Sequence, residues 1–148
     1  MKTALIVIDV QSDFCENGAL AVNEGDSVVP VINEMLCNYE IVCLTQDWHP
    51  TGHSSFASCY GNKSPFDLIE MSYGKQVLWP DHCVQGSAGA DFHKDLNTNL
   101  ADMIVRKGRN PAIDSYSAFF ENDQKTPTGL HGYLQTRQVE KLDLVGLA

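Results

Sequence analysis

Aspartate and histidine residues occur in this sequence at a spacing that suits metal binding. One residue separates Asp47 from His49, so on an extended segment both side chains project to the same side and can offer oxygen and nitrogen to one ion. A third ligand from farther along the chain would complete a catalytic type of site with open positions. His82 and His53 are the candidates for it. Surface or packing roles for these histidines are the alternative, and the spacing alone does not decide.

A second chemical signal is a carboxylate inside an apolar run. Asp9 lies near the end of residues 4–10 (ALIVIDV). Burying a carboxylate costs several kcal/mol unless a partner compensates for it, so this position predicts a nearby cation or hydrogen-bond donors. Lys107 ends another apolar run and is the natural candidate. A structural ion pair or a turn cap is the alternative to a catalytic role.

Alternating strand and helix patterns must position these residues. We expect a helix that Asp26 or Ser27 caps, with Pro30 in its first turn and apolar residues recurring from Val28 to Tyr39. A second helix is expected over about residues 128–138. Strands are predicted at 4–10, 40–47, 103–108 and 141–148. This order predicts an α/β fold, a three-layer α/β/α sandwich with a mainly parallel sheet and the first strand central.

The predicted strand ends are where the polar residues gather. Ligands of open α/β sheets bind beyond the carboxyl ends of the strands, where Asp9, Asp47 and Lys107 lie. The connection of about 55 residues between the second and third strands holds four of the five histidines and both tryptophans. Connections this long are functional, folded on themselves or disordered. We therefore expect it to build a site.

Composition limits the classes of function. The 148 residues are enough for one domain, predicted over 1–148, and the net charge of -9 opposes binding to nucleic acid or to anionic membranes. No secretory signal pattern or membrane-spanning run is present, and the five cysteines form no CxxC pair. We expect reduced thiols, a cytoplasmic location and a small-molecule partner.

Four ordered motifs resemble those of nicotinamidases (pyrazinamidases), a group of the isochorismatase-like cysteine hydrolases. They are residues 9–15 (DVQSDFC), 45–50 (TQDWHP), 79–86 (WPDHCVQG), and 106–108 (RKG) leading to 114–119 (DSYSAF). The resemblance runs from Leu5 to Ala148. It implies an isochorismatase-like hydrolase fold and the hydrolysis of nicotinamide, and of pyrazinamide, through a cysteine thioester in NAD salvage.

The resemblance also implies roles for individual residues. Asp9 matches the general base and Lys107 the cation of an Asp, Lys, Cys triad. Asp47, His49 and His82 match the ligands of one divalent ion that holds the ring nitrogen of the substrate; zinc is expected, with iron and manganese as alternatives. His53 falls near a further histidine of the site. Phe14, Leu20, Trp79 and Tyr116 match the pocket residues. Phe14, Trp79 and Tyr116 could otherwise be core aromatic residues.

The sequence departs from the family at the nucleophile. The family's cysteine follows a segment that here reads Gly146-Leu147-Ala148, and none of the five cysteines matches it. Ala148 matches an oxyanion-hole residue that acts through its backbone N–H. We expect this polypeptide alone not to turn over amide. It is either part of a longer nicotinamidase or a metal- and pyridine-binding module without turnover.

Two further expectations follow. The later strands of the family are missing here, so the sheet left open beside the strand at 141–148 would expose apolar faces and an edge. This favours association or poor solubility. The alternative without any family resemblance is a flavodoxin-like binding or interaction domain, which would hold no stoichiometric metal.

Overall fold

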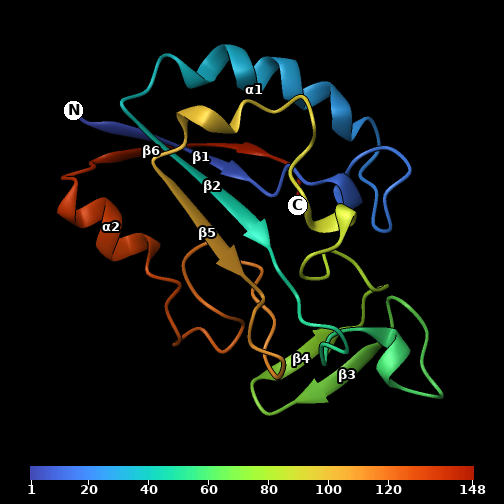
Figure 1. Ribbon diagram of the computed structural model, residues 1–148. Coiled ribbons are helices and arrows are strands. Elements are labelled where there is room, and N and C mark those ends of the chain that lie inside the picture. Colours follow the sequence, from blue (N-terminus) through green and yellow to red (C-terminus); the bar gives the residue numbers. More distant parts are fainter.

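The computed structural model describes residues 1–148 as a parallel sheet with helices on both faces and a small separate hairpin (Figure 1). The α-helices are α1 (Val28–Leu36) and α2 (Leu130–Thr136). The strands are β1 (Thr3–Ile8), β2 (Ile41–Asp47), β3 (Leu68–Met71), β4 (Gly74–Val77), β5 (Met103–Lys107) and β6 (Lys141–Gly146). The main sheet has the order β5-β2-β1-β6 with every pair parallel, so β1 is internal as expected.

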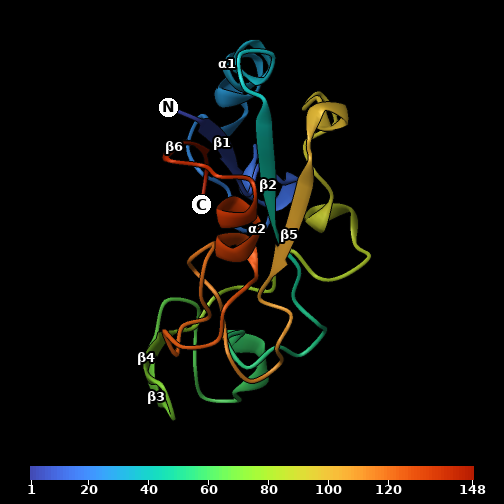
Figure 2. The ribbon, with the colours of Figure 1, turned by 90° about the vertical axis from the view of Figure 1, so that its left-hand side faces the viewer.

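Side-chain alternation along the strands produces three layers. Leu5 and Val7 of β1 pack with α1, whereas Ala4 and Ile6 pack in a second cluster with Leu130 of α2. Successive strand residues point to opposite faces of a sheet, so the two helices cover opposite faces (Figures 1 and 2). The predicted α/β/α sandwich is confirmed.

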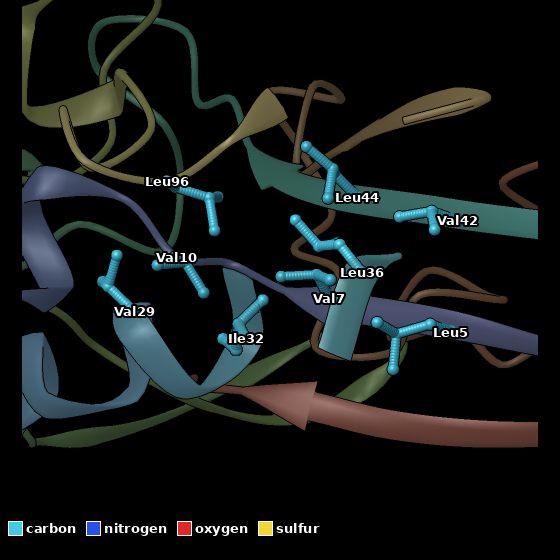
Figure 3. Close-up of a cluster of buried hydrophobic side chains, with 9 residues drawn as sticks. All are labelled: Leu5, Val7, Val10, Val29, Ile32, Leu36, Val42, Leu44 and Leu96. Carbon is cyan, nitrogen blue, oxygen red and sulfur yellow. The ribbon is translucent and has the colours of Figure 1, made fainter. Parts of the chain in front are cut away.

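The larger core lies between α1 and the sheet. Figure 3 shows nine buried side chains there, contributed by α1, by β1 and β2, by Val10 just beyond β1 and by Leu96. Val29, Ile32 and Leu36 recur at a spacing of three and four, which places them on one side of the helix. The apolar pattern therefore predicted the buried face of α1 correctly.

The structure differs from the expectations at the ends of elements. The second helix covers only Leu130–Thr136, and the first ends at Leu36 instead of reaching Tyr39. Asp9 lies one residue beyond β1 with φ of 46°, a left-handed conformation that ends the strand and turns the chain.

An antiparallel hairpin that the sequence patterns did not predict lies inside the long connection. Its strands, β3 and β4, are short and partly polar, so neither shows a clear alternation of apolar and polar residues. Beyond the arrowheads of β2 and β5, the hairpin lies at the end of the sheet where the candidate residues gather (Figure 1).

The described edge of the sheet at β6 is open, with Leu144 62% exposed. Association between copies through this edge stays a prediction. Neither α-helix is long and apolar enough to cross a membrane.

Packing of α1 against the sheet gives a test of the core. Ile32 is 1% exposed and its neighbour Val31 is 56% exposed. Replacing Ile32 by Ala removes buried methyl groups and leaves a cavity, so the free energy of unfolding should fall by about 2–5 kcal/mol. Val31→Ala, on the same helix, should change it by less than about 0.5 kcal/mol. Urea denaturation of both variants measures the difference; equal losses would contradict the described face of α1.

Candidate functional site

Parallel register brings three charged residues together at the carboxyl ends of the strands. β2 and β5 pair so that Asp47 is opposite Lys107, and Asp9 follows the neighbouring strand β1. The Lys107 Nζ lies 2.6 Å from Asp47 Oδ1 and 2.7 Å from Asp9 Oδ2. All three side chains are at least nine-tenths buried. The expected partnership of Asp9 with Lys107 is present, and Lys107 also binds a second carboxylate.

Charge coupling within this group sets the protonation of its members. Burial opposes the charge of Lys107, but the carboxylates of Asp47 and Asp9 outweigh it and raise the pKa of the ammonium. Burial also opposes the charge of Asp47, yet Lys107 holds the pKa of this carboxyl well below its usual range. The buried pair of Lys107 and Asp47 is therefore ionised at neutral pH.

Asp9 has the opposite behaviour. Burial raises the pKa of its carboxyl to about 6; Lys107 opposes this shift and the Asp47 carboxylate adds to it. Thr45 donates from Oγ1 to Asp9 Oδ1 at 2.6 Å and accepts from the Asp9 backbone N–H at 3.1 Å. Asp9 Oδ2 pairs with the Lys107 ammonium, whose Nζ lies 2.7 Å away. One oxygen of Asp9 is thus held by Thr45 and the other by Lys107, and burial still raises the pKa of the carboxyl.

A trio of donor atoms that fits a divalent metal lies beside this group. His49 Nε2 and His82 Nε2 are each 3.6 Å from Asp47 Oδ2, and the donor atoms of the three residues lie within 4.8 Å of one another. His49 Nε2 is buried and has no hydrogen-bond partner. Leaving such an atom unpaired is costly, so a ligand for it is expected. Two imidazoles and a carboxylate are a usual zinc ligand set.

Backbone carbonyls fix the imidazoles in the tautomer that metal binding needs. His49 Nδ1 lies 3.0 Å from the Gly108 carbonyl, and His82 Nδ1 lies 2.8 Å from the Pro80 carbonyl. A carbonyl only accepts, so each Nδ1 carries the proton and each Nε2 presents a lone pair. Gly108 has φ of 68°, and a Cβ there would lie 2.4 Å from the His49 ring. Only glycine allows the backbone to approach His49 this closely.

His53 belongs to a neighbouring group and not to the trio. Its Nδ1 lies 2.8 Å from Ser55 Oγ and its Nε2 lies 2.7 Å from the Asn110 carbonyl, so both ring nitrogens are hydrogen-bonded. Its ring centroid is 4.6 Å from that of His49. In this structure His53 supports the His49 ring through packing.

Asp114 is a member of the site that sequence reasoning did not single out. It is 2% exposed, and it lines a pocket together with Asp9, Asp47 and Lys107. Its Oδ1 lies 3.8 Å from His49 Nε2. Asp114 offers an additional oxygen close to the open side of the trio. The motif at 114–119 contains this aspartate and was the available signal. The resemblance gave Asp114 no role, so the sequence alone did not identify it.

Another group of metal-binding residue types, Cys15, Asp26 and His93, has different chemistry. His93 Nδ1 accepts from the Asp95 backbone N–H at 3.2 Å, so its Nε2 carries the proton and faces Asp26 Oδ2 at 3.7 Å. Asp26 Oδ1 accepts the Glu16 backbone N–H at 2.8 Å. These groups satisfy each other, and no nitrogen lone pair is directed into the cluster.

An open pocket of about 580 Å³ connects the charged residues with an apolar wall. Among its lining residues are all four of the expected pocket residues and the chain's last residue. It is lined by Asp9, Phe14, Leu20, Ala21, Val22, Asp47, Val77, Trp79, His82, Lys107, Asp114, Tyr116 and Ala148. The rings of Trp79 and Tyr116 meet edge to face with centroids 6.1 Å apart. A flat ring fits between such a wall and the polar strand ends.

The cysteines do not take part in this pocket. None of the five lines it, and none forms a disulfide. Burial raises the pKa of Cys83, and raises the pKa of Cys15 and of Cys43 to about 11 each. These three are thiols at neutral pH and therefore poor nucleophiles. Cys37 and Cys59 are exposed, outside the pocket lining.

Known proteins similar to this chain share one family. The Isochorismatase domain family matches residues 3–148. A nicotinamidase of Acinetobacter baylyi is 50% identical over 98% of this chain and 68% of its own length. A nicotinamidase of Escherichia coli is 44% identical over 98% of this chain and 70% of its own length.

Solved structures agree with this relationship. A nicotinamidase/pyrazinamidase of Acinetobacter baumanii has a TM-score of 0.97 at 51% identity, covering 99% of this chain and 71% of that one. A yeast nicotinamidase bound to the inhibitor nicotinaldehyde has a TM-score of 0.92 at 28% identity, with coverages of 99% and 75%. A Pyrococcus horikoshii pyrazinamidase in complex with zinc has a TM-score of 0.76 at 34% identity, with coverages of 100% and 72%. The chain belongs to the isochorismatase-domain family, among the nicotinamidases and pyrazinamidases.

Proposed function

We propose that this chain carries the metal- and ring-binding part of a nicotinamidase, an enzyme that hydrolyses nicotinamide to nicotinate and ammonia in NAD salvage. The observation that supports this most is the pocket that Asp9, Asp47, His82 and Lys107 line together with an aromatic wall. The buried His49 Nε2 lies 3.6 Å from Asp47 Oδ2, next to this lining. Relatives named nicotinamidase, and structures holding nicotinaldehyde or zinc, support the choice of ligand and ion.

Asp47, His49 and His82 would hold one divalent ion, for which we propose zinc. When bound, the ion supplies a Lewis acid for the ring nitrogen of the substrate. Zinc fits this ligand set, and iron and manganese also bind imidazole and carboxylate ligands. Asp47 serves two groups at once, since Oδ2 faces the imidazoles and Oδ1 binds Lys107. The ion site and the proton-transfer site are therefore coupled through one carboxylate.

Asp9 would act as the general base. A carboxyl whose pKa is about 6 accepts a proton near neutral pH and can return it later. Lys107 holds Asp9 next to Asp47 by pairing with both carboxylates. Phe14, Leu20, Trp79 and Tyr116 enclose the ring, and Ala148 lines the pocket where its backbone N–H would serve the oxyanion.

The thioester route needs a cysteine thiolate that attacks the amide carbon and expels ammonia. No cysteine of this chain meets that requirement, because none lines the pocket. We propose that these 148 residues bind the metal ion and the pyridine ring. The chain covers 68–71% of the length of relatives named nicotinamidase.

Metal and ligand binding test the proposal together. Purified chain loaded with Zn²⁺ should hold about one ion per chain by elemental analysis and bind nicotinate by calorimetry. His49→Ala should lose both, because it removes one of three metal ligands. His131→Ala, an exposed histidine on α2, should lose neither. Nicotinate binding that persists in the His49 variant would contradict the role of the trio.

Lys107 gives a test of the charged group. In Lys107→Met, two buried carboxylates lose their cation, so the free energy of unfolding should fall by about 3–5 kcal/mol. Lys141 pairs with Asp143 on the surface at 3.0 Å, and Lys141→Met should cause no comparable loss. Urea denaturation of the metal-free variants measures both. A Lys107 variant as stable as the wild type would show that the buried pair does not support the fold.

Asp9 predicts a pH dependence of stability. Its folded pKa of about 6 lies above the unfolded value of about 4, so the contribution of Asp9 is full below pH of about 4 and is lost as pH rises through about 6. Relative to Asp9→Asn, wild-type stability should therefore fall between pH 4 and 7, measured by urea denaturation in chelator.

Asp123 provides a control of opposite sign. Backbone N–H groups of Thr126 and Lys125 lower the pKa of this exposed carboxyl, so its contribution is present at neutral pH and is lost as pH falls. Relative to Asp123→Asn, wild-type stability should fall toward acid. Identical trends for the two variants would contradict the raised pKa of Asp9.

A further inference from the structure

A buried amide, Gln76 of β4, links the hairpin to the aromatic wall of the pocket. Gln76 is 0% exposed and uses all its hydrogen-bonding capacity. Its Nε2 donates to the Val77 carbonyl at 2.8 Å and to the Tyr116 hydroxyl at 2.7 Å. Its Oε1 accepts from Tyr73 Oη at 2.8 Å and from Asn122 Nδ2 at 3.2 Å. This network fixes Tyr116 relative to β4.

Backbone groups at both ends fix the orientation of these amides. The Val77 carbonyl only accepts, so the Gln76 atom beside it is the nitrogen. The Tyr116 backbone N–H only donates, and it donates to Asn122 Oδ1 at 3.0 Å. The Asn122 nitrogen therefore faces Gln76, whose atom on that side is the oxygen. Flipping either amide would place a donor against a donor and an acceptor against an acceptor. The Gln76 atom beside the Tyr116 oxygen is therefore the donating Nε2.

The Tyr116 O–H is consequently available as a hydrogen-bond donor. Its oxygen accepts from Gln76 Nε2 and from Trp79 Nε1 at 3.2 Å, and both donors are fixed. A phenol oxygen that accepts two hydrogen bonds keeps one O–H to donate. No protein acceptor takes this proton, and Tyr116 lines the pocket that also holds Asp9 and His82.

We infer that Gln76 and Trp79 orient the Tyr116 hydroxyl as a hydrogen-bond donor toward an acceptor atom of the ligand in the pocket. Tyr116 contacts the ligand, and Gln76 is a positioning residue that acts through it. The ligand class is a flat heteroaromatic ring bearing a carbonyl, a carboxylate or a second ring nitrogen. The inference rests on the proposed function, because it assigns a partner within the same site.

Two substitutions remove the donor by different means. Tyr116→Phe removes the hydroxyl and keeps the ring. Gln76→Glu keeps the shape of the side chain but places a carboxylate oxygen beside the hydroxyl, which then donates its proton to that oxygen and away from the pocket. Each change should weaken the binding of nicotinate to the Zn²⁺-loaded chain by about 3- to 10-fold, as expected for one neutral hydrogen bond.

The double variant tests whether Gln76 acts through Tyr116. Because both substitutions remove the same hydrogen bond, the chain carrying both should bind nicotinate no more weakly than Tyr116→Phe alone. Calorimetry measures the affinities, and near-UV circular dichroism checks that the aromatic wall is intact. Tyr133→Phe on α2, outside the pocket lining, is the control and should bind like the wild type.

The outcomes separate this inference from the proposed function. Wild-type affinity in Tyr116→Phe, or losses that add in the double variant, would overturn the inference and leave the proposed function standing. A wild-type chain that binds Zn²⁺ but no nicotinate would overturn the proposed function, and the inference with it.

Discussion

The ion pairs that Lys107 makes with Asp9 and Asp47 are the interaction on which the site depends. Three buried charges are costly unless they compensate each other with short contacts. One ammonium for two carboxylates leaves an excess negative charge, and the structure places it unequally. Asp47 stays ionised and faces the two histidines, whereas the pKa of Asp9 rises to about 6. A single cation thereby gives two neighbouring carboxylates different pKa shifts.

This arrangement follows from the topology of the sheet. In parallel strands the carboxyl ends meet at one edge, and the order β5-β2-β1 sets Lys107, Asp47 and Asp9 on or directly after three adjacent strands. Gly108 then lets the chain pass against the His49 ring and supplies the carbonyl that fixes its tautomer. The strand register fixes the charges, and the first residue after β5 prepares a metal ligand.

The sequence predicted the layers, the four sheet strands and the charged strand ends, because these depend on local apolar periodicity and on where polar residues interrupt it. It did not predict the β3–β4 hairpin, whose short strands lack a clear pattern, or the extent of the second helix. Thr45 and Gln76 were also not found. Their importance comes from contacts to Asp9 and Tyr116, which lie 36 and 40 residues away along the chain, and no local signal reports such contacts.

Hydrogen bonds at the second nitrogen of each imidazole explain why similar residue sets differ in function here. His49 and His82 face carbonyls through Nδ1 and so present lone pairs at Nε2, while His93 faces a backbone N–H and presents a proton. The same reasoning applies to Tyr116, where two donors on the oxygen leave a proton for the pocket. In each case a backbone group settles the direction of a side-chain hydrogen bond, directly for the histidines and through the Gln76 and Asn122 amides for Tyr116. The chemistry that the pocket offers therefore depends on backbone and amide groups that hydrogen-bond to its side chains.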